Sequence, residues 1–406
     1  MSDPLLSKPP LKFALSLAVV GALGPAAVDM YLPSLPEMAR DLATGHAGIQ
    51  LTLTVFLFAM GFGQLLFGPC VDAWGRRGPL IAGLLLFSGG AFGAALAPSL
   101  QALLLARGVQ GLGSALTLVV IMSMVRDVSQ GVQAAKLFAL LMTIEGVAPI
   151  IAPAVGGFID GQAGWRGVLF TLGAMGVLVA INSLLSLKET LPAERREPLN
   201  IPMICRNYAR IASDRQFLLP TLAVSAVFFF LFAYIAGATF VYQAVYQLPA
   251  AQFGFLFGAT GIAILLGAML AGRLVSRHGL GRMSILGVSC ILLGACLALI
   301  SVVAGAGLVG VVVSMAVALL GLGIAETTLM SLVMSSQSKS LGSTAALLGA
   351  FQLGISACAT PVSGLLSSFG AQAWCGLLVA SAATAWLLTA FSVRRAPVVH
   401  SLSTGH

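Results

Sequence analysis

Long apolar stretches separated by short polar segments recur along the whole chain. Each stretch holds about 20 residues, which is the length that an α-helix needs to cross the hydrocarbon core of a bilayer. An even number of such spans places both termini on the same side of the membrane. The pattern predicts twelve spans, at residues 12–32, 49–70, 79–97, 101–125, 134–159, 166–187, 217–240, 251–275, 283–303, 307–334, 342–367 and 372–393.

The composition agrees with this pattern. Hydrophobic residues make up 58% of the chain and charged residues 8%, whereas a soluble domain carries about 25% charged residues. Lys8 and Lys12 precede the first apolar stretch, as in a signal peptide, but this stretch is longer than a typical signal and eleven more follow. We therefore predict an all-α, multi-pass membrane protein with an uncleaved first helix.

Basic residues gather on one side of the predicted topology. Arg40 and Arg166 alone fall on the other side, and Arg107 lies within a span. The positive-inside rule then places both termini in the cytoplasm, in a bacterial inner membrane. This orientation explains the net charge of +8, so the charge does not predict nucleic-acid binding. The remaining basic residues, on the side of the termini, are Lys8, Lys12, Arg76, Arg77, Arg126, Lys136, Lys188, Arg195, Arg196, Arg206, Arg210, Arg215, Arg273, Arg277, Arg282, Lys339, Arg394 and Arg395.

The longest polar segment, residues 188–216, divides the spans six and six. Three short patterns recur across it: 68–75 matches 272–279, 111–113 matches 321–323, and 153–156 matches 361–364, at offsets of 204, 210 and 208. Such an internal repeat predicts two duplicated halves that rock against each other around a central site. The predicted halves are residues 1–187 and 217–406, with 188–216 as a cytoplasmic linker and a short cytoplasmic tail at the end.

Several motifs resemble those of a known transporter family. GPCVDAWGRRGPL, at 68–80, resembles the loop between helices two and three of the major facilitator superfamily. RGVQGLGSA, at 107–115, resembles the arginine motif of its drug/proton antiporters, and GVAPIIAPAVGG, at 146–157, resembles the motif that marks antiporters rather than symporters. VDMYLPSLP and KETLPAERREP are similar to the bicyclomycin and chloramphenicol resistance (Bcr/CflA) branch. The resemblance implies the twelve-helix fold of that superfamily and drug:proton antiport.

Three carboxylates lie inside predicted spans: Asp29, Glu145 and Glu326. An ionisable group in hydrocarbon costs several kcal/mol or takes up a proton, so a chain that keeps three of them is expected to use them. We predict that Asp29 couples protons and binds substrate; the alternative is a carboxylate that caps a broken helix near Pro33 and Pro36.

Glu145 and Glu326 match no position of the family pattern. Glu145 is predicted to join in proton coupling, and both are predicted to contact the substrate, which a cation would favour. The alternative for each is a permanently protonated acid that hydrogen-bonds a neighbouring helix.

Arg107 is the basic residue within a span, and its guanidinium cannot release its proton. The resemblance implies that it links proton binding to conformation; the alternative is a side chain that extends to the nearer interface. Tyr31, Tyr234 and Tyr242 are predicted to line the substrate site as amphipathic groups.

A set of gating residues is predicted from the two loop and helix motifs. Asp72 with Arg76 one turn later, and Arg77 with Asp127, would form a cytoplasmic latch, which by resemblance favours the outward-open state. Ser276 replaces the acidic residue in the second copy of the loop. The prolines and glycines of the fifth span weaken one helix and admit a close neighbour, as small residues also do in ordinary membrane bundles. The full set is Gly68, Asp72, Gly75, Arg76, Arg77, Asp127, Pro149, Pro153, Gly156 and Gly157.

Enzyme and cofactor signatures are absent from the sequence. The six cysteines show no CxxC spacing, so we expect neither a metal site nor a disulfide. There is no phosphate-binding loop for ATP, and the SxxK match at 336–339 has no partners. We predict a monomeric, proton-coupled exporter of small amphipathic drugs or metabolites that needs no cofactor. A proton-coupled importer on the same fold and a non-transporting receptor remain as alternatives.

Overall fold

A computed structural model of the chain describes residues 11–129, 131–196, 198–336 and 341–395. Among these residues, eleven helices are long and apolar enough to cross a membrane. One of them, α6 (Gly131–Ser186), turns back at Gly164, whose φ of 64° lies in the left-handed region that glycine adopts readily. Its two arms are separate spans, so all twelve predicted spans and the all-α fold class are confirmed.

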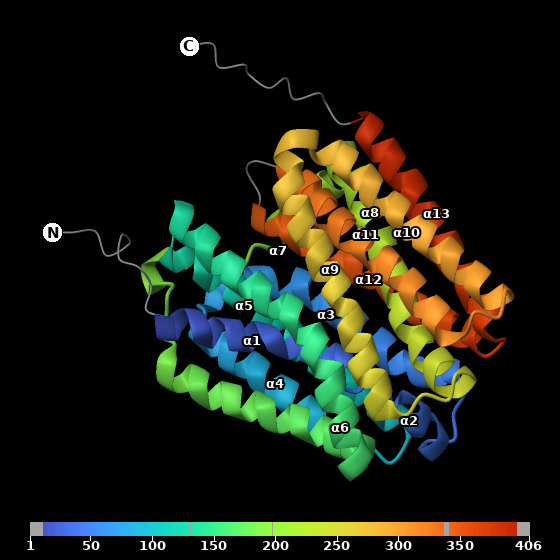
Figure 1. Cartoon of the computed structure of the whole chain (residues 1–406). Coiled ribbons are helices and arrows are strands. Elements are labelled where there is room, and N and C mark those ends of the chain that lie inside the picture. Colours follow the sequence, from blue (N-terminus) through green and yellow to red (C-terminus); the bar gives the residue numbers. More distant parts are fainter. Residues whose placement is uncertain (1–10, 130, 197, 337–340, 396–406) are drawn as a thin grey trace.

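The helices form two bundles (Figure 1), one coloured blue to green and the other yellow to red. The first contains α1 (Leu11–Asp29), α3 (His46–Trp74), α4 (Arg77–Ala95), α5 (Leu100–Val128) and α6. The second contains α8 (Arg215–Phe240), α9 (Ala250–His278), α10 (Leu280–Val303), α11 (Gly307–Ser335), α12 (Leu341–Ser367) and α13 (Ala371–Arg395). Short elements complete the described residues: η2 (Leu32–Ser34), α2 (Leu35–Asp41), η3 (Ala193–Arg195), α7 (Ile201–Ala212) and the π-helix η4 (Val241–Val245).

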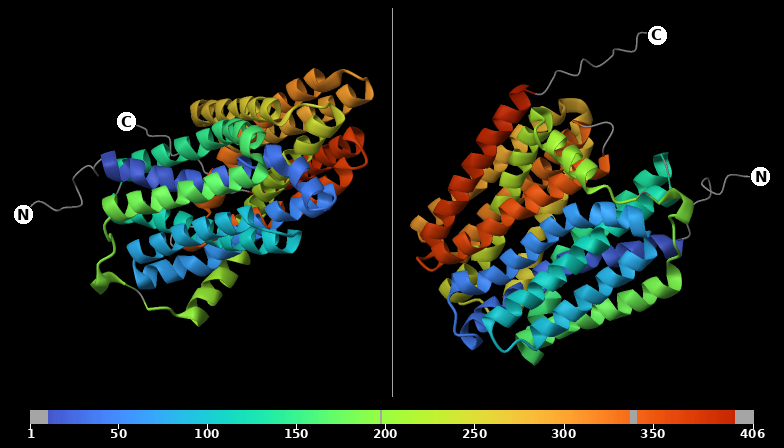
Figure 2. Two further views of the ribbon diagram at one scale, coloured as in Figure 1. Left: turned by 90° about the horizontal axis from the view of Figure 1, so that it is seen from below. Right: turned by 180° about the vertical axis from the view of Figure 1, so that it is seen from behind.

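We name the two ends of the molecule after the chain. The terminal face carries the start of α1, the end of α13 and the segment that joins the bundles, and the distal face carries α2 and Gly164. The bundles meet at the distal face and diverge towards the terminal face (Figures 1 and 2).

The bundles meet along two seams of close backbone contact. In the seam of α3 with α12, a Cβ added to Gly61 would lie 3.0 Å from the Cβ of Leu353. In the seam of α6 with α9, Gly254 packs against the carbonyl of Pro153. Because glycine has no side chain, it lets two helix backbones approach this closely.

Close glycine contacts also repeat between the bundles. Gly113 of α5 packs on α4, against Gly83 and Phe87, and Gly321 of α11 packs on α10, against Gly287 and Ile291. The α4 and α10 residues differ by 204 positions and the two glycines by 208. These contacts support a duplication, whose exact boundaries stay a prediction.

The contacts also correct the sequence alignment of this repeat. Gly111, which the sequence paired with Gly321, faces the Phe56 carbonyl of α3 rather than α4. The offset of 210 was therefore two residues too long, because it matched letters of a Gly-Leu-Gly triplet rather than helix faces.

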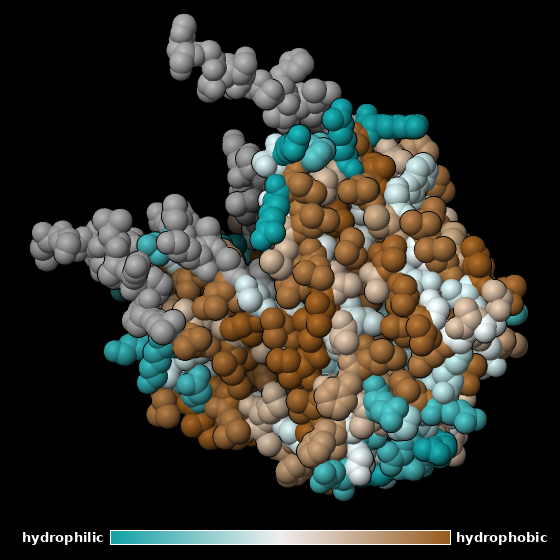
Figure 3. Space-filling view, viewed as in Figure 1, coloured by the Kyte–Doolittle hydropathy of each residue, from teal (hydrophilic) through white to brown (hydrophobic). Residues whose placement is uncertain are grey.

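The outer surface is apolar across its middle and polar towards its ends, as the brown belt of Figure 3 shows. Large apolar side chains such as Phe58, Leu105, Phe158 and Leu185 are exposed on the molecule. In water this surface would aggregate, but in a bilayer it contacts lipid tails.

The predicted linker contains a helix that the sequence analysis missed. In α7, the Asn200 side chain caps the first turn by accepting a hydrogen bond from the Met203 N–H. The Tyr208 hydroxyl donates to the Leu65 carbonyl at 3.2 Å, and the Asn207 amide donates to the Ser343 hydroxyl at 3.0 Å. The helix therefore touches both bundles at the terminal face.

Candidate functional site

The first span is broken near the distal face. Pro33 and Pro36 lack the backbone N–H that a continuing helix needs, so α1 ends at Asp29 and the short helices η2 and α2 follow. The Asp29 side chain is 4% exposed. Within the described residues, its carboxylate has no hydrogen-bond or ion-pair partner.

Arg107 holds the broken end of α1. Its side chain is fully buried, and its guanidinium donates to Gln110 Oε1 at 2.7 Å and to the Ala27 carbonyl at 3.0 Å. Ala27 lies in the last turn of α1, where carbonyls lack helical partners and the helix dipole is negative. The rings of Tyr31 and Phe56 lie 4.4 and 4.5 Å from the guanidinium carbon, so two aromatic faces add to the stabilisation of the cation.

This geometry excludes the alternative in which Arg107 extends to the membrane interface. Arg107 also makes no ion pair with Asp29 in the described part of the chain. Protonation of Asp29 would therefore break no salt bridge with any described residue.

The glycines of α6 pack against this break. Gly156 lies against the backbone of Met30, the residue that follows Asp29, and leaves no room for a Cβ. Gly157 faces the other bundle, where an added Cβ would lie 2.7 Å from the Ala250 carbonyl of α9. The predicted gating residues Pro153, Gly156 and Gly157 thus lie where α1, α6 and α9 meet.

Glu145 and Glu326 come from different bundles, and the charge of Glu326 acts on Glu145. Glu145 is on α6, where its Oε1 atom is buried and has no hydrogen-bond partner among the described residues. This atom would lie 3.2 Å from a Cβ on Gly21 of α1. Glu326 is on α11 and keeps part of its side chain accessible, although it lies deep in the bundle. Within the described residues, no hydrogen bond joins the two acids to each other, and neither acid acts on the charge of Asp29.

The three predicted tyrosines are buried in this structure. Tyr31 covers Arg107, and its hydroxyl lies 3.2 Å from Thr52 Oγ1. Tyr234 and Tyr242 pack around Trp374, with ring centroids 6.2 and 6.3 Å from it. Their contact with substrate stays a prediction.

A cluster of charged groups at the terminal face is centred on Arg76. Its Nη1 lies 2.8 Å from Asp72 and its Nε lies 2.8 Å from Asp127. The predicted pair of Arg77 with Asp127 is wrong. Gly75, at a φ of 89°, turns the chain so that Arg76 reaches α5, while Arg77 donates to the Leu184 carbonyl at 2.8 Å.

The start of the linker joins this cluster. Glu189 accepts hydrogen bonds from the backbone N–H groups of Arg76 and Arg77 at 2.9 and 3.2 Å, and Thr190 donates to Asp127 at 2.9 Å. Burial raises the pKa of Glu189, but backbone N–H groups, that of Leu191 foremost, outweigh it and hold this pKa below its ordinary value. The carboxylate is therefore charged at neutral pH and binds the loop.

All members of the cluster belong to the first bundle or to the linker. For that reason the cluster does not itself connect the two halves. It is present in this structure, in which the bundles meet at the distal face. Its influence on the conformational balance stays a prediction. Gly68 was predicted to act with the cluster, but a Cβ added to it would make only an ordinary contact, 3.8 Å from the Tyr208 hydroxyl. Pro149 lies apart from the cluster within α6, about one turn before Pro153.

We expect Asp127→Asn to lower stability more than Asp72→Asn. The side chain of Asp127 is 17% exposed and that of Asp72 is 51% exposed. Losing a charged partner of the buried Arg76 should cost about 1–3 kcal/mol, whereas an exposed pair contributes about 1 kcal/mol or less. Thermal unfolding of both variants in lipid nanodiscs measures the difference, and equal melting temperatures would contradict it.

Sequence reasoning missed the partners of Arg107. Gln110 follows it at the i+3 spacing that joins side chains on one helix face, so that contact had a local signal. Phe56 and the Ala27 carbonyl come from other helices, and nothing local in the sequence points to them.

Comparisons with known proteins agree with this geometry. Residues 17–361 match the family model of the Major Facilitator Superfamily. An uncharacterized MFS-type transporter of Bacillus subtilis is 35% identical over 360 residues, which cover 87% of this chain and 89% of that protein. A chloramphenicol resistance protein of Pseudomonas aeruginosa is 32% identical over 70% of this chain and 67% of its own length. A bicyclomycin resistance protein homolog of Haemophilus influenzae is 31% identical over 66% of this chain and 67% of that protein.

Solved structures show the same fold. The xylose transporter of E. coli, in a partially occluded inward-open conformation, superposes with a TM-score of 0.75 at 14% identity, over 95% of this chain and 99% of that one. The human organic anion transporter MFSD10 gives a TM-score of 0.70 at 16% identity, over 94% of this chain and all of the other. At such identities the likeness concerns the fold alone.

Proposed function

The chain belongs to the major facilitator superfamily of multi-pass membrane transporters, and we propose that it exports small amphipathic drugs or metabolites in exchange for protons. The relatives named for bicyclomycin and chloramphenicol resistance support drug export. The observation that supports proton coupling is the buried carboxylate of Asp29 at the broken end of α1, which has no partner in the part of the chain that the structure describes.

The proposed cycle places the terminal face, with both termini, in the cytoplasm of a bacterial inner membrane. When the distal face opens, a proton reaches Asp29 and displaces the substrate. The bundles then rock to the arrangement seen here, and release of the proton to the cytoplasm frees the site. Arg107 contributes by holding the last turn of α1 in place through the Ala27 carbonyl. A change in the charge of Asp29 then acts on a fixed helix end.

Glu145 and Glu326 supply recognition in this proposal. One acid comes from each bundle, so a cation between them is attracted to both halves at once. An opposite charge strongly stabilises a carboxylate that has no other partner in a low-dielectric site. The preferred substrates are therefore amphipathic compounds with a positive group, carried by a monomer without a cofactor.

Transport in everted membrane vesicles tests this function. Vesicles that contain the chain should accumulate drug when a pH gradient is imposed and stop when the gradient is collapsed. A susceptibility panel of cells with and without the chain identifies the compounds to use. Accumulation in the opposite direction would favour the importer. Unchanged function after neutralising Asp29, Glu145 and Glu326 together would favour a receptor.

We expect Glu145→Gln and Glu326→Gln to weaken binding of cations about 10- to 100-fold, or about 1.4–2.8 kcal/mol, and to leave neutral ligands nearly unchanged. Glutamine keeps the shape and hydrogen-bonding groups but removes the charge. Binding of tetraphenylphosphonium and of chloramphenicol to each variant measures the effect. Equal losses for both ligands would show that the acids serve packing instead.

A further inference from the structure

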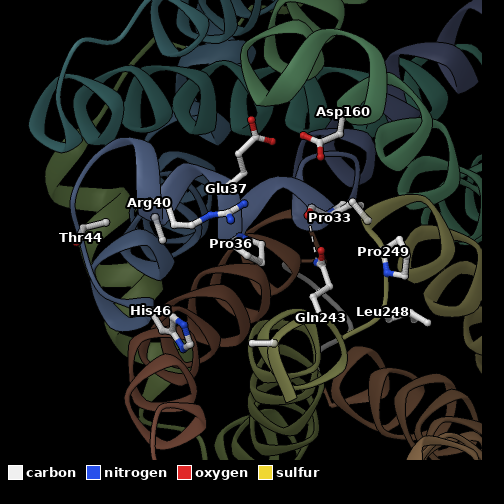
Figure 4. Close-up of a pocket in the computed structure, with 13 residues that line it drawn as sticks. Pro33, Pro36, Glu37, Arg40, Thr44, His46, Asp160, Gln243, Leu248 and Pro249 are labelled. Atoms are coloured by element: carbon white, nitrogen blue, oxygen red, sulfur yellow. Dashed lines mark hydrogen bonds between the residues drawn. The ribbon is translucent and has the colours of Figure 1, made fainter. Parts of the chain in front are cut away.

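A second candidate site lies on the distal face, on the outer side of the contacts that join the two bundles. It is a cleft of about 480 Å³, large enough for a small organic molecule. Pro33, Glu37, Arg40 and Asp160 line it from the first bundle (Figure 4). Gln243 of η4 lines it from the second, together with Ala244 and the segment 248–250.

The cleft is bordered by contacts between the bundles. Gln243 Nε2 donates to the Pro33 carbonyl at 3.1 Å, as the dashed line in Figure 4 shows. His46 stacks on Phe240 with ring centroids 3.8 Å apart. Each of these contacts must break when the bundles separate at the distal face, so the cleft exists only while that face is closed.

When both carboxylates of the cleft are ionised, the charged groups around it leave one negative charge uncompensated. The charged groups that act on Glu37 are Asp160, Asp41, Arg40 and Arg166. Arg166 is already occupied, because it pairs with Asp41 at 3.5 Å and lies 4.0 Å over the Trp165 ring. Arg40 remains to balance two carboxylates, those of Glu37 and Asp160, and His46 adds no charge in its neutral form.

The two carboxylates face the same space from α2 and α6 (Figure 4). The Oδ1 atom of Asp160 is buried without a hydrogen bond of standard geometry within the described residues, and the Ser34 hydroxyl is its polar neighbour. Apolar walls complete the cleft, formed by Pro33, Pro36, Leu248 and Pro249. A single positive group beside a small apolar body matches these features better than a bare metal ion, which prefers several oxygen ligands.

We propose that this cleft binds small organic monocations and that a bound cation holds the distal face closed. A ligand that binds one conformation alone shifts the population towards it, by an amount that grows with the ligand concentration relative to its dissociation constant. Binding at the cleft does not depend on the proposed export function. The consequence of binding does rest on that function, because an exported cation that accumulates outside the cell would then slow its own release.

Protection of a cysteine tests the site with benzylammonium as the probe and benzyl alcohol as its neutral counterpart. The variant Ala244→Cys places a thiol in the exposed part of the cleft, and it is labelled with a maleimide in lipid nanodiscs, where both faces are accessible. The parent chain gives the background. Benzylammonium should slow labelling and benzyl alcohol should not.

Charge variants in the Ala244→Cys background decide where the probe acts. Glu37→Gln with Asp160→Asn should raise the protecting concentration of benzylammonium about tenfold or more, equivalent to one lost charge contact. Glu194→Gln, which removes an exposed charge of the linker, is the matched control and should change nothing. Protection that persists in the double variant, or that benzyl alcohol gives equally, would overturn the proposal.

A second pair of variants separates this proposal from the proposed function. Glu145→Gln with Glu326→Gln should leave protection intact, because these acids lie between the bundles rather than in the cleft. Loss of protection in that pair would mean that the cation acts from the central site, and the distal site would be rejected. Export can fail in every variant without affecting this conclusion, since labelling needs no gradient.

Discussion

Asp29→Asn should abolish proton-driven accumulation of substrate while the protein still folds and inserts. The Asp29 carboxylate has no partner to lose in the described residues, so an amide of equal size fits the same space. Asparagine cannot take up and release a proton, so the variant has no means of coupling the gradient to the bundle movement. We expect complete loss of pH-driven uptake in everted vesicles, with a melting temperature close to that of the parent.

Two comparisons distinguish a loss of proton coupling from a loss of folding. Glu194→Gln, at an exposed position of the linker, should transport normally. Asp29→Asn should still exchange substrate across the membrane without a gradient, with weaker binding because the site has lost one carboxylate. If Asp29→Asn concentrates drug when only a pH difference drives it, the coupling group lies elsewhere.

Gly156→Ala should have the second largest effect. An added methyl group would collide with the Met30 backbone, and backbone cannot rotate away as a side chain can. α6 must then move off the break of α1, at a cost of about 1–3 kcal/mol or more. Because Met30 follows Asp29 directly, the shift displaces the coupling carboxylate, and we expect transport to fall close to background.

The same helix provides matched controls. Gly146 and Gly161 have open space where a Cβ would lie. Their replacement by alanine should leave transport intact and raise stability by up to about 1 kcal/mol, since alanine favours the helix. Comparing all three variants by vesicle uptake and thermal unfolding isolates the collision at Met30. Normal transport by Gly156→Ala would show that the contact is not needed.

The fold was predictable because each span carries its own signal. Twenty apolar residues need a helix in lipid wherever they occur, and Gly164 lies between two such runs. The linker helix α7 was missed because it is short and polar on one side, and its stability comes from contacts with Leu65 and Ser343 of the two bundles. Those contacts depend on tertiary packing, which the linker sequence does not encode.

The site was predictable only in part for a similar reason. Asp29, Glu145 and Arg107 stand out as charges within apolar runs, so hydropathy alone identifies them. Their surroundings follow from helix packing: Glu326 acts on Glu145 from the other bundle, and Arg107 donates to a carbonyl of α1. The Arg77–Asp127 pair was wrong because helical spacing says nothing about the turn that Gly75 makes before Arg76.

The anchoring of the linker has a mechanical consequence. Its start is held by the backbone bonds of Glu189, and its helix begins at the Asn200 cap. The eight residues between Leu191 and Asn200 can reach about 30 Å when extended. This contour length sets an upper limit on how far the start of α7 can move from the first bundle. A deletion in the segment lowers that limit in proportion, so covalent chain length, and not only contacts at the site, bounds the movement of the halves.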